Sequence, residues 1–338
     1  MERVDYNRIV SDCQDGVFAV IGERGTGKGL GGVAKNAFKI ILPLYFFAFE
    51  RYNGRMKLYF LRKNPTETAA IAVLFAIGFF GLPYAEIGAL FLKDALAAEI
   101  GGLLICRLVA AAFALTALIG LGLGGTLFPR GSGKEVLICA IPALCVAVNN
   151  LPIVALARGT AGVSASADLV ALFALQCLFV AAFEELCFRG IVFPLLLQRF
   201  GAARKGRLAA AVVSSALFGA LHFLNLLSGA PLGAVALQAG YSFLIGGMLA
   251  ALLFSGGSVL LCALAHACYN FCGLIVPTLG FGEFHAVWNP PEIALTAAVG
   301  ILAAVLIVWR FCRCRGDSAA ELVRFSESAE ELRARIRR

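Results

Sequence analysis

The feature that most constrains the fold of this chain is a series of long apolar segments that carry almost no charge. Between residues 208 and 282 the sequence contains no Asp, Glu, Lys or Arg. Only 15% of all residues are charged, whereas a soluble globular domain has roughly 25%. A membrane-spanning helix needs about 20 predominantly apolar residues. The sequence therefore predicts an all-α polytopic membrane protein.

By this length criterion we predict about eight transmembrane helices. Their expected positions are residues 68–92, 101–128, 136–157, 168–197, 208–227, 232–254, 259–279 and 293–311. Basic residues favour cytoplasmic loops, and in this arrangement one side receives Arg130, Lys134, Arg199, Arg204, Lys205, Arg207 and Arg310. The opposite loops carry chiefly Lys93 and Arg158. We therefore expect both termini in the cytoplasm.

The chain divides into four expected regions. Residues 1–66 form a cytoplasmic or interfacial N-terminal segment, in which the apolar stretch 40–49 is too short to span a membrane and has basic residues on both sides. Residues 67–167 hold the first transmembrane helices, and residues 168–311 form a transmembrane core. Residues 312–338 are polar, with apolar residues at helical spacing, and predict a cytoplasmic amphipathic tail. The Ala- and Gly-rich composition without a cleavable-signal pattern is typical of a bacterial cytoplasmic membrane protein.

The N-terminal segment contains a sequence that resembles a phosphate-binding loop. Residues 22–28 fit its first seven positions, but the eighth should supply a hydroxyl and is Gly29, and no α/β domain follows. We therefore expect no nucleotide. The net charge of +8 is explained by basic helix ends and tails, so no nucleic-acid partner is expected. The 11 cysteines have no paired spacing and are interpreted as packing residues.

Three charges interrupt the apolar segment 168–197. Glu184, Glu185 and Arg189 are the only charged residues between residues 169 and 198. An ionisable residue inside a membrane costs free energy and indicates a functional site. The spacing of four lets Glu185 pair with Arg189, while Glu184 points about 100° away around the helix.

Two histidines interrupt the uncharged segment that follows. His222 comes four residues after Phe218, and His266 comes four residues before Asn270. Residues four apart share a face of a helix. Counted from the predicted cytoplasmic helix ends, both imidazoles can meet Glu184 inside the bundle, so three helices converge on one polar pocket.

A carboxylate and two imidazoles in an apolar pocket form a set that can activate water. The carboxylate can act as a general base, and one imidazole can share the water. A second imidazole with a neighbouring amide can stabilise the oxyanion that develops when a carbonyl is attacked. This chemistry predicts the hydrolysis of a peptide or an ester.

These residues also resemble a known family. Glu-Glu-x-x-x-Arg at Glu184, Phe-x-x-x-His at Phe218 and His-x-x-x-Asn at His266 are similar to the three motifs of the CPBP family, in the same order and one in each transmembrane helix. This family comprises the type II CAAX prenyl endopeptidases and their bacterial relatives, also called Abi proteins. The resemblance covers about residues 168–273 and implies a CAAX-protease-like helical bundle that cleaves a peptide or lipidated protein within the membrane.

The resemblance also implies a role for each motif residue. Glu184 would be the general base, His222 would position the attacking water, and His266 and Asn270 would form the oxyanion hole. Glu185, Arg189 and Phe218 would support the site. Every motif position is occupied by the expected residue type.

Family members are often described as metalloproteases, and Glu184, His222 and His266 would suit zinc with an open fourth position. The two histidines come from separate helices without an H-E-x-x-H pair, so we expect no metal and keep zinc as the alternative. A transporter or proton relay could also use buried Glu and His residues, but internal repeats are not evident. A non-catalytic scaffold or bacteriocin-immunity protein is the third possibility. The substrate itself is not identified by the sequence.

Overall fold

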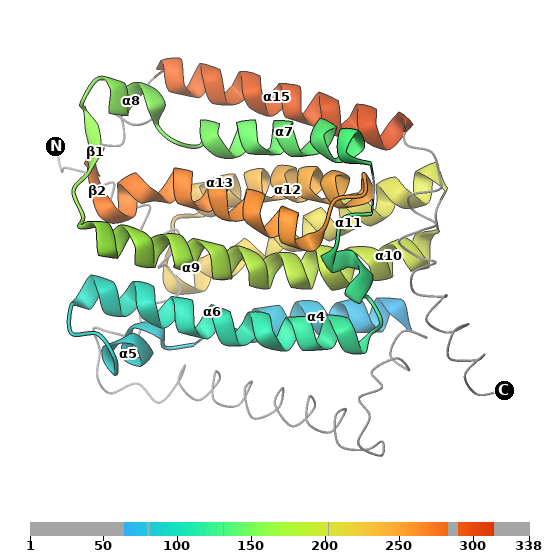
Figure 1. The fold of residues 1–338 in the computed structure, drawn as a ribbon, viewed down its shortest axis with the longest axis horizontal. Helices are drawn as coiled ribbons and strands as arrows, with labels where there is room; N and C mark the ends of the chain where they lie inside the picture. Colours follow the sequence, from blue (N-terminus) through green and yellow to red (C-terminus); the bar gives the residue numbers. More distant parts are fainter. Residues whose placement is uncertain (1–63, 80–81, 131, 202, 283–289, 314–338) are drawn as a thin grey trace.

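The chain forms a bundle of nearly parallel and antiparallel helices (Figure 1). The computed structural model describes residues 64–79, 82–130, 132–201, 203–282 and 290–313. The predicted all-α class is confirmed. The phosphate-loop-like residues 22–28, the expected interfacial stretch 40–49 and the expected tail 317–338 lie outside the described residues.

Within the described residues, six helices are long and apolar enough to cross a membrane. They are α6 (Ala95–Gly120), α9 (Ala167–Glu185) continued as far as the end of α10 (Phe193–Phe200), α11 (Arg204–Leu221), α12 (Leu232–Phe254), α13 (Val259–Leu279) and α15 (Pro290–Arg313). The two other predicted spans coincide with shorter helices, because α4 (Pro65–Gly78) has 14 residues and α7 (Gly133–Asn149) has 17. The number of eight spans therefore remains a prediction.

The first predicted span, residues 68–92, is not one helix in the structure. α4 ends at Gly78, and the short helix α5 (Tyr84–Ala89) begins after Pro83. Proline has no backbone N–H and disfavours helical conformation in the residue before it, so Pro83 prevents one continuous helix from running through Leu82 into α5. The carbonyl of Phe79 at the end of α4 accepts hydrogen bonds from the Tyr84 hydroxyl and from Arg107 Nη1, the latter at 3.3 Å.

α9 lies at the centre of the arrangement that positions the site. It packs between α6 on one side and α13 on the other, and α7 lies between α13 and α15 (Figure 1). α11 and α12 pack against each other, and η4 (His222–Ser228) joins α11 to the turn before α12. Short elements complete the ends of the bundle: η2 (Gly124–Leu127), α8 (Ile153–Ala157), β1 (Ala161–Val163) and β2 (Gly280–Gly282).

A two-stranded ribbon connects the beginning of α9 to the end of α13. β1 precedes α9, β2 follows α13, and the two strands pair antiparallel with Gly162 opposite Phe281. The carbonyl of Leu279 also accepts hydrogen bonds from Ser164 N and Ala165 N. The two helices are therefore fixed in register at the end of the bundle shown at the left of Figure 1.

Glycines allow α11 and α12 to approach closely. A Cβ atom at Gly219 would lie 2.6 Å from the carbonyl oxygen of Ala239, which is closer than real contacts allow. Small residues at helix crossings are common in membrane bundles, because they let backbones come together. This crossing brings the α11 end that precedes His222 against α12.

Candidate functional site

The two glutamates lie at the point where α9 changes its helical geometry. α9 ends at Glu185 and continues directly into η3 (Leu186–Val192), which is a π-helix, and then into α10. All seven residues of η3 are buried. Single π-helical turns inside α-helices occur often at functional sites, because they shift the faces on which side chains project. This π-helical turn was not predicted from the sequence.

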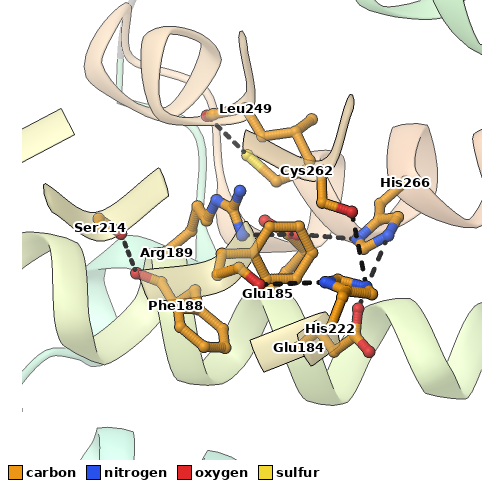
Figure 2. A network of polar contacts seen from close by, with 11 residues as sticks. Glu184, Glu185, Phe188, Arg189, Ser214, His222, Leu249, Cys262 and His266 are labelled. Atoms are coloured by element: carbon orange, nitrogen blue, oxygen red, sulfur yellow. Dashed lines mark hydrogen bonds and ion pairs between the residues drawn. The ribbon is translucent and has the colours of Figure 1, made fainter. Parts of the chain in front are cut away.

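Glu185 is the centre of the polar network. Its Oε1 atom accepts a hydrogen bond from Arg189 Nη1 at 3.1 Å and lies 2.9 Å from His266 Nδ1 (Figure 2). The side chains of Glu185 and Arg189 are 0% exposed. The predicted pairing of Glu185 with Arg189 is therefore present, and the contact with His266 is an addition that spacing alone did not indicate.

Glu184 lies beside the same imidazole on its other edge. Its Oε2 atom is 3.7 Å from His266 Nε2 (Figure 2). Because an ionised carboxylate can only accept hydrogen bonds, Nδ1 of a neutral His266 carries the proton that is donated to Glu185. Nε2 is then the nitrogen that faces Glu184.

His222 is oriented in the same manner by a backbone group. It is the first residue of η4, directly after α11, and its Nδ1 lies 3.1 Å from the carbonyl oxygen of Phe218. A carbonyl oxygen only accepts, so Nδ1 donates and Nε2 of the neutral ring carries a lone pair. The hydroxyl of Ser242 on α12 lies 3.5 Å from this Nε2.

The aromatic ring of Phe218 packs against all three basic side chains of the site. Its centroid lies 5.3 Å from that of His222 and 5.7 Å from that of His266, both in edge-to-face arrangements. The guanidinium carbon of Arg189 lies 4.5 Å from the same centroid, in a cation–π geometry. Phe218 therefore contacts the guanidinium and both imidazoles with one ring.

Asn270 is the predicted residue that stands apart. It is half-buried on α13, one turn beyond His266. In the described part of the chain its amide makes none of the polar contacts that join the other members of the network. The structure thus brings together Glu184, Glu185, Arg189, Phe218, His222 and His266, with Asn270 next along the helix.

Sequence reasoning missed the polar residues contributed by α12. Ser242 contacts His222, and Gln238, four residues earlier, accepts a buried hydrogen bond from Asn225 Nδ2 at 2.8 Å. The second bond ties η4, the element that begins with His222, to α12. The signal was present in the sequence, because two polar residues four apart in an apolar segment share a helix face.

The arrangement bears on whether the site holds a metal. Glu184, His222 and His266 have the donor chemistry that zinc uses. Among the described residues, however, no three His, Cys, Asp or Glu side chains are grouped so that they could hold a metal ion. The expectation of a metal-free site remains a prediction, to be tested by metal removal.

Comparison with known proteins identifies the segment that carries this network. Residues 166–272 match the family model described as type II CAAX prenyl endopeptidase Rce1-like. The segment runs from the start of α9 to two turns before the end of α13 and contains all seven predicted site residues. Neither the comparison with curated proteins nor that with solved structures gives a match. The resemblance inferred from the motifs is confirmed over this segment, in an integral membrane protein.

Proposed function

We propose that this protein is an intramembrane endopeptidase that hydrolyses a peptide bond of a membrane-associated or lipidated substrate. The observation that carries the proposal is the convergence of Glu184 on His266, at 3.7 Å, within a segment that matches a protease family. Glu184 is 6% exposed, so the base is shielded from bulk water. A shielded site strengthens the electrostatic interactions that stabilise a transition state.

The attacking water is held by Glu184 and His222. Nε2 of His222 has a lone pair, because Nδ1 donates to the Phe218 carbonyl. A water molecule can donate one O–H to this nitrogen and the other to the Glu184 carboxylate, which leaves an oxygen lone pair for attack on a carbonyl carbon. Glu184 takes the water proton as the C–O bond forms, and returns it to the leaving amine as the C–N bond breaks.

The developing oxyanion is stabilised by His266 with Asn270. His266 donates from Nε2 only when its ring carries both protons, because Nδ1 already donates to Glu185. The role of Glu185 and Arg189 is to hold the His266 ring in orientation, as a buried carboxylate does for the histidine of a catalytic triad.

The experiment that tests the proposal is a cleavage assay on the purified full chain in lipid nanodiscs. The probe is a lipidated peptide, and mass spectrometry of the products identifies the bond that is cut. A peptide or lipidated protein that is cleaved in membranes supports the proposal. In parallel, trapping on an inactive Glu184→Gln chain in native membranes should enrich proteins that the parent chain shortens. If the parent chain shortens no protein enriched in this way, the protease proposal is contradicted.

Metal removal distinguishes the proposed metal-free mechanism from the zinc-dependent alternative. After dialysis against a chelator, we expect cleavage to remain within about two-fold of the untreated rate, because a glutamate and a histidine suffice to activate water. The metal content of the purified chain, measured by mass spectrometry of the elements, should be well below one ion per chain. Stoichiometric zinc, removed together with activity and restored with it, would overturn the metal-free mechanism.

A further inference from the structure

Arg189 is bonded on one side only. Its Nη1 donates to Glu185, and its guanidinium lies over the ring of Phe218. Its Nε and Nη2 atoms have no hydrogen-bond partner among the described residues, although the side chain is fully buried. The position of the guanidinium on this second side must therefore be determined by what surrounds it.

The second side is formed by the backbone of α12. A Cβ atom at Gly246 would lie 2.8 Å from Arg189 Nη2, a distance that real Cβ contacts essentially never show. The same Cβ would lie 3.1 Å from both Cβ and Oγ of Ser215 on α11. The guanidinium thus occupies space that is open only because residue 246 lacks a side chain.

We propose that Gly246 is a positioning residue of the site, which acts through Arg189, Glu185 and His266. This inference rests on the proposed function. The absent side chain allows Arg189 to lie against α12, from where Nη1 reaches Glu185 Oε1 at 3.1 Å. The same oxygen holds His266 Nδ1 at 2.9 Å and thereby sets which imidazole nitrogen faces Glu184. A glycine on α12 thus helps to determine which nitrogen of an imidazole on α13 is bonded to Glu185.

The contact at Gly246 differs from an ordinary close packing of helices. The atom that a new methyl group would strike first is the far end of a long, flexible side chain. At Gly219 the corresponding atom is the backbone oxygen of Ala239, which cannot move without shifting α12. Substitution of Gly246 should therefore shift the Arg189 guanidinium without separating it from Glu185, and leave the fold intact. Substitution of Gly219 should instead destabilise the fold.

The first test compares Gly246→Ala with Gly247→Ala. We expect Gly246→Ala to lower kcat by about 10–100-fold, which is the usual effect of losing a partner that orients a site residue, with KM changed by less than about three-fold. Gly247→Ala is the matched control, because its Cβ would meet only Ser215 Oγ at an ordinary 3.9 Å. It should retain the parent kcat. The melting temperature should fall for Gly219→Ala and stay near the parent value for Gly246→Ala.

A double-mutant cycle with Arg189→Lys tests whether Gly246 acts through the guanidinium. Lysine keeps the positive charge but has no Nη2 atom to meet the new methyl group. If Gly246 acts through the Arg189 guanidinium, adding Gly246→Ala to Arg189→Lys should cause little further loss of kcat. The losses caused by the two substitutions are then not additive. Full additivity of the two losses would overturn the inference.

A spectroscopic readout keeps the test independent of proteolysis. The chain contains three histidines, so ¹⁵N-histidine labelling gives few imidazole signals, and His266→Gln assigns the one of interest. The Nδ1 proton bonded to Glu185 should give a strongly downfield signal in the parent and in Gly247→Ala, and should weaken or shift in Gly246→Ala. An unchanged signal and an unchanged kcat would refute the role of Gly246, whatever the substrate. An absence of proteolysis with a changed signal would refute the proposed function alone.

Discussion

Replacement of Glu184 by glutamine is expected to abolish peptide cleavage, with a loss in kcat of about 10²–10⁴-fold, the range typical of a missing general base. Glutamine has nearly the same shape as glutamate but cannot take a proton from the attacking water. Glu184 Oε2 lies 3.7 Å from His266 Nε2. The ion pair with Arg189 is made by Glu185 instead. The substitution should therefore leave the buried ion pair in place, and the protein should unfold near the parent temperature.

The measurement is the rate of cleavage of the lipidated peptide by purified protein, with thermal unfolding as the check on folding. Glu86→Gln is the matched control, because Glu86 is an exposed glutamate on α5 and its loss should leave the rate unchanged. Retention of the parent rate by Glu184→Gln would show that Glu184 is not the base, and the proposed mechanism would have to be abandoned.

The neighbouring glutamate should behave differently, because its removal leaves a buried positive charge without its partner. We expect Glu185→Ala to lower the free energy of unfolding by about 3–5 kcal/mol, as is usual when one member of a buried ion pair is removed. Both Glu185 and Arg189 are completely buried, so the guanidinium left without its carboxylate is shielded from bulk water. Activity should be lost as well, since His266 Nδ1 loses its acceptor.

A compensating change separates these two effects of Glu185. In Glu185→Leu combined with Arg189→Met, no charge remains unpaired, and apolar replacements of buried ion pairs are often as stable as the parent. The melting temperature should therefore recover towards the parent value, whereas cleavage should not, because His266 remains without a carboxylate. If cleavage recovered together with stability, Glu185 would have only a structural role.

The sequence predicted the later helices better than the earlier ones. The predicted spans 232–254 and 259–279 have the same bounds as α12 and α13. Local signals mark these ends: Pro231 precedes α12, and the Ser258 hydroxyl caps α13 by accepting from Leu261 N. The span 68–92 was wrong as one helix, because its apolar composition continues through Pro83 and hides the break.

The candidate site was predicted as a set of residues but not as a set of contacts. The spacing of four correctly paired Glu185 with Arg189 and placed Phe218 against His222. It could not show that Glu185 also binds His266, because that contact joins α9 to α13 and depends on how the two helices align. The π-helical turn after Glu185 was equally hidden, since five-residue spacing leaves no distinct pattern in a segment that is apolar on every side.

The ribbon formed by β1 and β2 has a consequence for how the protein is made. Its strands lie before α9 and after α13, so they can pair only when every segment between them has been synthesised and inserted. Contacts between such distant segments form late in folding, because the intervening loop must first be closed. Glu184 is thus present in the membrane well before the ribbon aligns His266 with it. A nascent chain that stops short of α13 has the proposed base without His266, so the proposed peptidase activity would arise only once α13 is in place.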